Sequence, residues 1–214
     1  MSKRTIAVLD YEVGNLKSII SAIDYLGAKV ICSQNIDDFL YTDALIIPGV
    51  GAYLQGIDTI KKHNYDQFIA FYKSSGRPIL GICLGMQLLL SDSSEFGLTK
   101  GLNIIPGVVR KLSDDDFGGS KLRLPHVGWA KLRFREDRTT LENKLLVNIS
   151  EENYFYFVHS YAGITLPEYS LAYTKYQSIQ FASIVSDENV IGVQFHPEKS
   201  GEVGLAMLSN FINL

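Results

Sequence analysis

The sequence predicts an α/β fold, in which a single domain holds a mostly parallel central sheet, flanking helices and additional antiparallel strands. Short apolar runs alternate with helical patterns in the first half of the chain, which is typical of a parallel sheet covered by helices. From about Gly101 the pattern changes to short β-rich runs separated by turn residues, as antiparallel strands require. The 214 residues show no internal repeat or low-complexity linker, so we expect one domain over 1–214.

The first half is expected to supply four strands and two clear helices. The strands are the apolar runs at 5–9, 28–32, 44–47 and 79–82. Asn15 is placed to cap a helix that ends near Gly27, and its apolar residues recur at helical spacing, at Leu16, Ile19, Ile20 and Ile23. A second helical stripe, which Gly76 and Pro78 end, consists of Tyr65, Phe68, Ile69 and Tyr72.

The second half is expected to add strands and a closing helix. The strands are predicted at 108–112, 132–134, 154–158, 171–176, 181–185 and 190–195. The closing helix has an inward stripe of Gly204, Met207, Leu208 and Phe211. The acidic, glycine-bearing segment 113–120 is expected to be a mobile loop.

The composition is that of a globular protein and indicates no nucleic-acid or membrane partner. Hydrophobic residues make up 46% and charged residues 20%, as in ordinary globular proteins, and the net charge of −3 gives no basic bias toward nucleic acid or anionic membranes. Cys32 and Cys83 are too few for a disulfide framework. The N-terminus is a poor signal peptide, and no apolar run approaches the roughly 20 residues of a membrane span. We therefore expect a cytoplasmic protein with reduced thiols.

The strongest chemical motif surrounds Cys83. The sequence Gly81-Ile82-Cys83-Leu84-Gly85 follows a predicted strand and precedes a helical run, which is the pattern of a nucleophile elbow with cysteine in place of serine. The glycines leave room where a strand turns sharply into a helix, and the helix N-terminus favours negative charge on the sulfur. The competing interpretation is an inert buried cysteine in a glycine-bearing turn.

A histidine and a glutamate follow the predicted strand 190–195. In an extended chain, residues two apart point to the same side, so His196 and Glu198 are expected to lie together beyond the carboxyl end of the strand. Cys83 would attack, His196 would move the proton, and Glu198 would hold the imidazole. These residues are too few and wrongly spaced for a metal site, so no metal and no cofactor are expected.

A third signal is the segment Pro48-Gly49-Val50-Gly51, directly after the strand 44–47. Glycines let backbone N–H groups approach a substrate atom closely, so this loop, together with the Leu84 N–H, could form an oxyanion hole. An ordinary strand-to-helix glycine turn would look the same.

Together these segments resemble the class I (triad) glutamine amidotransferases over essentially the whole chain. The resemblance is specific to the branch formed by the glutaminase subunits of imidazole glycerol phosphate synthases. The motifs that carry it are PGVGA at 48–52, GICLGMQLL at 81–89, PHVGW at 125–129, YFVHSY at 156–161 and GVQFHPEKSG at 192–201.

The resemblance implies further roles. The N–H groups of Val50 and Leu84 would be the oxyanion donors after a peptide flip in the loop, so the resting chain would be poorly active. Glutamine would be held by a group of substrate-binding residues, Gly49, Gly51, Gln87, His159, Ser160 and Tyr161. The family also implies a heterodimer with a (βα)8-barrel cyclase that takes up the ammonia, with Asn15, Trp129 and Tyr156 facing it.

One residue departs from the family pattern. Glu12 stands where the family commonly has glycine, close to the expected partner surface. Away from the motifs, Cys32 is expected to be inert and His63 to be solvated. Trp129, as a lone aromatic, would more often be a core residue, but the family motif favours the interface.

Three alternatives remain open at this stage. A paralogous subunit of the same chemistry could supply ammonia for sugar amidation in surface polysaccharide synthesis. A stand-alone cysteine hydrolase of the same fold would turn over without a partner. A non-catalytic binding module could keep the fold, although the presence of all three triad residues argues against it.

Overall fold

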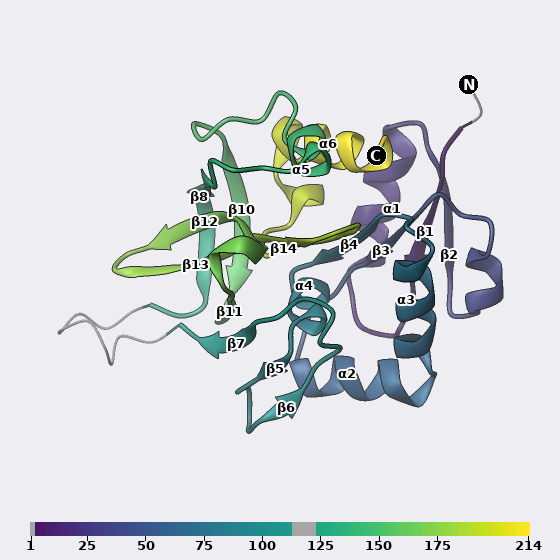
Figure 1. Ribbon diagram of the computed structural model, residues 1–214, viewed down its shortest axis with the longest axis horizontal. Coiled ribbons are helices and arrows are strands. Elements are labelled where there is room, and N and C mark those ends of the chain that lie inside the picture. The colour runs from purple at the N-terminus through teal and green to yellow at the C-terminus, as the bar shows by residue number, and fades with distance from the viewer. Residues whose placement is uncertain (1–2, 113–122) are drawn as a thin grey trace.

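The computed structural model describes residues 3–112 and 123–214, and it has the predicted α/β architecture (Figure 1). The strands are β1 (Thr5–Leu9), β2 (Lys29–Ser33), β3 (Ala44–Ile47), β4 (Ile79–Ile82), β5 (Asp92–Ser93), β6 (Thr99–Lys100), β7 (Val108–Lys111), β8 (His126–Lys131), β9 (Arg133–Phe134), β10 (Tyr154–His159), β11 (Tyr161–Ile164), β12 (Ser170–Tyr176), β13 (Ile179–Asp187) and β14 (Val190–Val193). The α-helices are α1 (Leu16–Tyr25), α2 (Tyr53–Lys62), α3 (Tyr65–Ser74), α4 (Leu84–Leu89), α5 (Thr140–Leu145) and α6 (Gly201–Ile212). Short 3₁₀ turns lie at Ile36–Phe39, Pro167–Tyr169 and Pro197–Lys199.

The main sheet is parallel in its first part and antiparallel in most of the rest. Its order begins β2-β1-β3-β4-β14, with every neighbouring pair parallel, and continues through the antiparallel strands β13, β11 and β7. Strands β8 and β10 form a separate antiparallel pair. Because β3, β4 and β14 are parallel neighbours, the segments that follow them emerge at the same edge.

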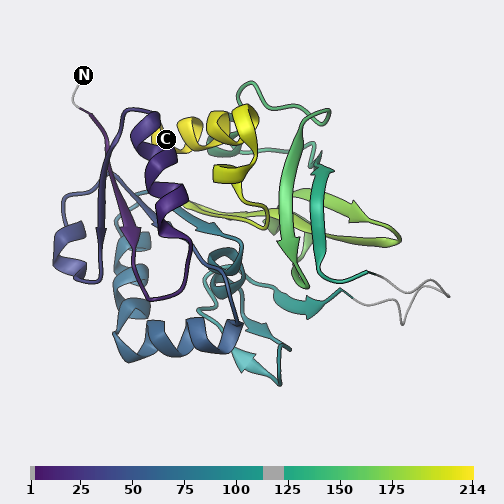
Figure 2. The same cartoon turned by 180° about the vertical axis from the view of Figure 1, so that it is seen from behind.

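Helices cover both faces of the parallel part. On one face α1 and α6 lie side by side, and on the other lie α2 and α3, as both views show (Figures 1 and 2). Alternate residues of the strands contribute to the two cores: Val8 and Ile46 pack with the α1–α6 side, whereas Leu9 and Ile47 pack with the α2–α3 side. This alternation is why the strands are continuous apolar runs in the sequence.

Most predicted elements are confirmed, with boundaries close to those expected. The strands at 5–9, 44–47 and 79–82 match in full, and the stripes of α3 and α6 are buried as expected. The strand predicted at 190–195 ends at Val193, so Gln194 and Phe195 already belong to the bend that leads to His196. The mobile loop expected at 113–120 lies outside the described residues.

The structure also contains elements that the sequence did not predict, among them α2, α5 and β11, and two further details differ from expectation. Asn15 occupies the N-cap position of α1, but its side chain makes no capping bond and instead donates to the Ser18 hydroxyl at 3.0 Å. Strand β8 was not predicted, because its glycine and half-exposed residues give no apolar run. Among the described residues, no helix has both the length and the apolar character that crossing a membrane requires.

Candidate active site

Cys83 occupies a strained turn between β4 and α4. Its φ of 53° and ψ of −106° lie outside the regions that L-residues prefer, a conformation that costs on the order of 1–3 kcal/mol. The flanking glycines are required by close packing: a Cβ on Gly85 would lie 1.8 Å from the Ile47 carbonyl oxygen, and one on Gly81 would lie 2.7 Å from the Gly85 backbone. The turn therefore fixes the sulfur at the edge where β3, β4 and β14 end.

His196 and Glu198 form a buried pair behind this turn. The His196 Nδ1 lies 2.8 Å from the Glu198 Oε1, and the two side chains are 2% and 5% exposed. The expected proximity is right, but its expected cause is wrong. His196 is extended, whereas Glu198 lies in the 3₁₀ turn Pro197–Lys199, which Pro197 favours. The backbone N–H of His196 donates to the Tyr156 carbonyl, which ties the pair to β10.

The surroundings of His196 favour its protonated form. Burial lowers the pKa of the imidazole, but Cys83 on one side and Glu198 on the other outweigh this and raise the pKa to about 9. The Nε2 atom is buried without a hydrogen-bond partner among the described residues. The unpartnered Nε2 is thus available to move a proton.

The loop after β3 lies against the turn in a closed arrangement. The Gly49 carbonyl accepts a hydrogen bond from the Leu84 N–H at 3.3 Å. A Cβ on Gly49 would lie 2.4 Å from the Tyr11 hydroxyl oxygen and 2.9 Å from the Leu84 Cβ, so the loop is tightly packed. The Leu84 N–H, one of the two expected oxyanion donors, is therefore already satisfied and cannot serve an oxyanion in this arrangement.

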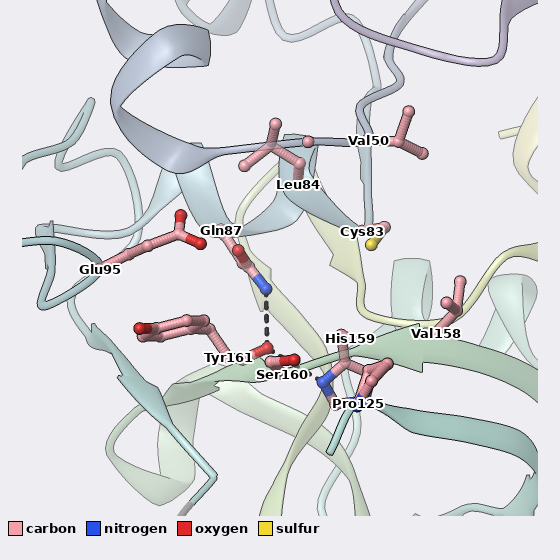
Figure 3. A pocket seen from close by; sticks show the side chains of 11 residues that line it. Val50, Cys83, Leu84, Gln87, Glu95, Pro125, Val158, His159, Ser160 and Tyr161 are labelled. Carbon is pink, nitrogen blue, oxygen red and sulfur yellow. Dashed lines mark hydrogen bonds between the residues drawn. The ribbon is translucent and has the colours of Figure 1, made fainter.

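A cavity of about 350 Å³ opens in front of the Cys83 sulfur (Figure 3). Its volume lies at the small end of the range for ligand pockets, roughly 300–1,000 Å³. Eight predicted site residues line it, Val50, Gly51, Cys83, Leu84, Gln87, His159, Ser160 and Tyr161, and the structure adds Glu95, Pro125 and Val158. Gly49, His196 and Glu198 are not part of the lining, although Gly49 adjoins it through Val50.

The Gln87 amide has a fixed orientation in this cavity. Its Nε2 donates to the Tyr161 carbonyl at 2.9 Å and to the Gln194 Oε1 at 3.0 Å. Both amide hydrogens are thereby used, and the Oε1 of Gln87 remains as an acceptor. Figure 3 shows the Gln87 side chain between Glu95 and the Tyr161 carbonyl.

Glu95 was not found by sequence reasoning. Its Oε2 accepts the Tyr53 N–H at the start of α2, at 2.6 Å, and its carboxylate lines the cavity. No motif surrounds it, because the segment after β5 reaches the site only through the folding of the chain against α2. A lone acidic residue in a turn gives no signal by itself.

His159 is held by protein groups on both ring nitrogens. Its Nδ1 lies 2.9 Å from the Tyr161 carbonyl oxygen and its Nε2 lies 3.3 Å from the His126 Nδ1. Burial lowers the pKa of His159 to about 3 and that of His126 to about 4, so both rings are neutral near pH 7. The His159 side chain therefore shapes the cavity wall and orients the 159–161 segment rather than offering a free ring nitrogen.

The residues expected at a partner surface are exposed, at least in part. Trp129 and Tyr156 face each other across β8 and β10, with ring centroids 5.8 Å apart, and Trp129 is 54% exposed. The same face of the strand pair carries two further exposed residues, Val127 and Tyr154. It also carries Val158, which lines the cavity. Asn15 is exposed on a different segment, before α1. Within the described residues, no group of three or more His, Cys, Asp or Glu side chains is arranged to hold a metal ion.

Comparisons with known proteins agree with this geometry. The family model "Glutamine amidotransferase class-I" matches residues 7–214. The imidazole glycerol phosphate synthase subunit HisH of Listeria monocytogenes is 41% identical over 206 residues, covering 96% of this chain and 94% of that protein. The protein of the same name from Bacillus velezensis is 37% identical, with 98% and 96% covered.

Solved structures share the fold at lower identity. A crystal structure of a glutamine amidotransferase superposes with a TM-score of 0.70 at 16% identity, covering 98% of this chain and 99% of that one. A chain in the structure of PurLQS from Thermotoga maritima gives a TM-score of 0.69 at 20% identity, with 99% of each chain covered.

The raised pKa of His196 leads to a prediction about pH. We expect its ring to titrate near pH 9 in the folded chain and at lower pH after Glu198→Gln, because the carboxylate no longer stabilises the imidazolium. The ordinary value is 6.5, so folding takes up a proton between these limits. The stability from this proton is fully present below about pH 6.5 and is lost as the pH rises through about 9. Histidine-resolved NMR titration measures the shift.

The His126 ring serves as the internal control for this titration. It has no bond to Glu198, so its low pKa should not change in the Glu198→Gln variant. An unchanged His196 titration in that variant would show that the carboxylate does not hold the imidazolium.

Proposed function

The chain belongs to the class I glutamine amidotransferase family, and from this premise we propose that it is the glutaminase subunit of an imidazole glycerol phosphate synthase. It would hydrolyse glutamine to glutamate and ammonia for histidine biosynthesis, as the names of its relatives indicate for them. The observation that carries the proposal is that the strained Cys83, which lines a small cavity, is a neighbour of the buried His196–Glu198 pair.

The proposed reaction follows from the order of these groups. The Cys83 thiolate attacks the side-chain carbonyl carbon of glutamine, and the carbonyl oxygen becomes an oxyanion. The imidazolium of His196 gives its proton to the departing nitrogen, ammonia leaves, and a glutamyl thioester remains. His196 then takes a proton from water, which attacks the thioester and releases glutamate and the thiolate. Glu198 holds Nδ1 throughout. The chemistry needs no metal and no cofactor.

The cavity supports one orientation of glutamine. The Glu95 carboxylate and the free Oε1 of Gln87 suit the α-ammonium group, since both are acceptors. The carboxamide would then lie at Cys83, and the 159–161 segment and Gly51 would enclose the amino-acid end. Glu95 is an addition to the substrate-binding residues expected from sequence.

The closed loop supports a resting state of low activity. Rotation of the Gly49–Val50 peptide would release the Leu84 N–H from the Gly49 carbonyl and turn the Val50 N–H toward the oxyanion. One preorganised oxyanion donor changes turnover by roughly 10²–10³-fold. Partner binding could therefore control activity by biasing this single peptide.

The partner is proposed to be a (βα)8-barrel cyclase that binds the face of β8 and β10. This face is half-exposed, rich in aromatic residues, and continuous with the cavity through Val158. Ammonia released at Cys83 could pass into such a partner without entering bulk water. We also propose that 1–214 form one amidotransferase domain and that the heterodimer is cytoplasmic.

The function is tested directly by Cys83→Ala. With the cyclase present, we expect the variant to lose synthesis from glutamine and to keep synthesis from added ammonium salts, because only the ammonia source is removed. Product formation is measured with each nitrogen source. His196→Ala should behave in the same way, and Glu198→Ala should retain more activity, since it acts through the imidazole. Normal glutaminase turnover in Cys83→Ala would contradict the proposal.

The role of Glu95 is tested by Glu95→Gln. We expect the KM for glutamine to rise about tenfold or more with a smaller change in kcat, because a charge-assisted bond to the ammonium contributes about 1.5–3 kcal/mol. The amide still accepts the Tyr53 N–H, so the fold is preserved. Steady-state kinetics of the complex give both constants. The matched control is Glu188→Gln, which lies at the opposite end of β14 and should leave KM unchanged.

The partner surface is tested by Trp129→Ala. Truncation of an aromatic interface anchor costs about 2 kcal/mol or more of binding, so we expect roughly thirtyfold weaker association with the cyclase. Titration calorimetry measures the affinity, and circular dichroism checks the fold. Tyr41→Ala is the control. Tyr41 is an exposed aromatic residue just before the amino end of β3, whereas the active site lies at the carboxyl end of that strand. Equal affinities of wild type and Trp129→Ala would remove Trp129 from the interface.

A further inference from the structure

Gln194 is a buried polar residue directly behind the nucleophile. Its side chain is 0% exposed, and its Nε2 lies 3.6 Å from the Cys83 sulfur. It does not line the cavity, so it approaches the sulfur from the protein side rather than from the substrate side. The mechanism described above does not use it.

The direction of the bond to sulfur follows from a chain of hydrogen bonds. The Tyr161 carbonyl can only accept, so the atom of Gln87 that faces it must be the donor Nε2. The same Nε2 donates to Gln194, so the Gln194 atom that faces Gln87 must be the acceptor Oε1. The other end of the Gln194 amide, its NH₂ group, is then the one that faces Cys83. The backbone thus determines an orientation that a free amide could reverse.

An N–H donor aimed at sulfur favours the anionic form. A thiol sulfur is a weak acceptor, whereas a thiolate is a full negative charge, and hydrogen bonds to charged groups are the stronger ones. Because Gln194 is fully buried, its NH₂ group has no water to bind as an alternative. The bond therefore stabilises the thiolate more than the thiol.

We propose that Gln194 is a positioning residue that donates a hydrogen bond to the Cys83 sulfur and holds it as the thiolate that attacks glutamine. The inference rests on the proposed glutaminase function and deepens it. It also connects substrate binding to the nucleophile, because Gln87, which lines the cavity, holds the Gln194 amide in place. The titratable groups around the sulfur are Tyr11 and His196, with Glu95 and His159 on the cavity wall.

The test is alkylation of Cys83 by iodoacetamide as a function of pH. The thiolate displaces iodide and forms a carbon–sulfur bond, so the rate follows the thiolate fraction. We expect the midpoint of the rate profile to move up by about one pH unit or more in Gln194→Leu, with a roughly tenfold slower rate at neutral pH. Gln194→Met preserves the side-chain size and should show the same direction if the leucine variant folds poorly.

Two controls separate this effect from general damage. Cys32 is exposed, and mass spectrometry of the same samples resolves its alkylation, which should not shift. Thr174→Val removes a different buried polar group, one that donates to the Lys131 carbonyl at 3.2 Å, and should leave the Cys83 profile unchanged. Gln87→Leu should shift the profile in the same direction as Gln194→Leu. The two substitutions should not be additive, because both act through one bond.

The outcomes distinguish this inference from the function on which it rests. An unchanged midpoint in folded Gln194→Met overturns the role of Gln194 and leaves Cys83 as the nucleophile. A wild-type Cys83 that reacts no faster than Cys32 at neutral pH overturns both. A shift in Gln194→Met together with unchanged Cys32 and Thr174→Val profiles supports the inference.

Discussion

The positive φ of Cys83 is the constraint on which the site depends. A strained turn persists only when its neighbours determine it, and here both adjacent strands do so. The Cys83 N–H donates to the Val193 carbonyl of β14 at 2.7 Å, and α4 presses Gly85 onto the Ile47 carbonyl of β3. The turn is therefore bound from both sides, and the same contacts fix the segments that carry His196 and Gly49. One local strain thus sets the relative positions of the nucleophile, the base and the loop.

The loop after β3 is the part that can change at low cost. Among the described residues, one backbone hydrogen bond joins the loop to the turn, from the Leu84 N–H to the Gly49 carbonyl, and such bonds contribute only about 0.5–1.5 kcal/mol net. The segment before α1 lies against it. The Tyr11 hydroxyl, which has no hydrogen-bond partner in the part of the chain that the structure describes, is close to Gly49, and Asn15 is exposed at the surface. Glu12 in this segment has a φ of 64°, a left-handed backbone conformation that glycine adopts more readily than glutamate. A partner that contacts Asn15 would therefore act close to the loop.

The sequence was sufficient to predict the features that depend on neighbouring residues in the chain, namely the strands that carry the site and the turn at Cys83. The strands that carry the site are continuous apolar runs, and the elbow glycines are visible because close packing allows no side chain at 81 and 85. It was insufficient where contacts are distant in the chain. Glu95 reaches the cavity only through the N-terminus of α2, and Gln87 meets Gln194 across 107 positions. The backbone at Glu198 was also not predictable. Glu198 does lie beside His196, as expected, but it lies in a 3₁₀ turn and not in the extended chain on which that expectation was based.

Polarity across the cavity determines which end of an amino-acid amide can face the sulfur. Behind the Cys83 sulfur, outside the cavity lining, the groups are donors: the Gln194 NH₂ and the protonated His196. At the opposite end they are acceptors: the Glu95 carboxylate and the Oε1 of Gln87. Gln87 contacts both groups of residues. Its Nε2 donates to the Tyr161 carbonyl and to Gln194, so its Oε1 is left to accept a hydrogen bond from the ligand. An ammonium group is therefore favoured away from the sulfur, and a reacting carbonyl, which gains negative charge, is favoured beside it.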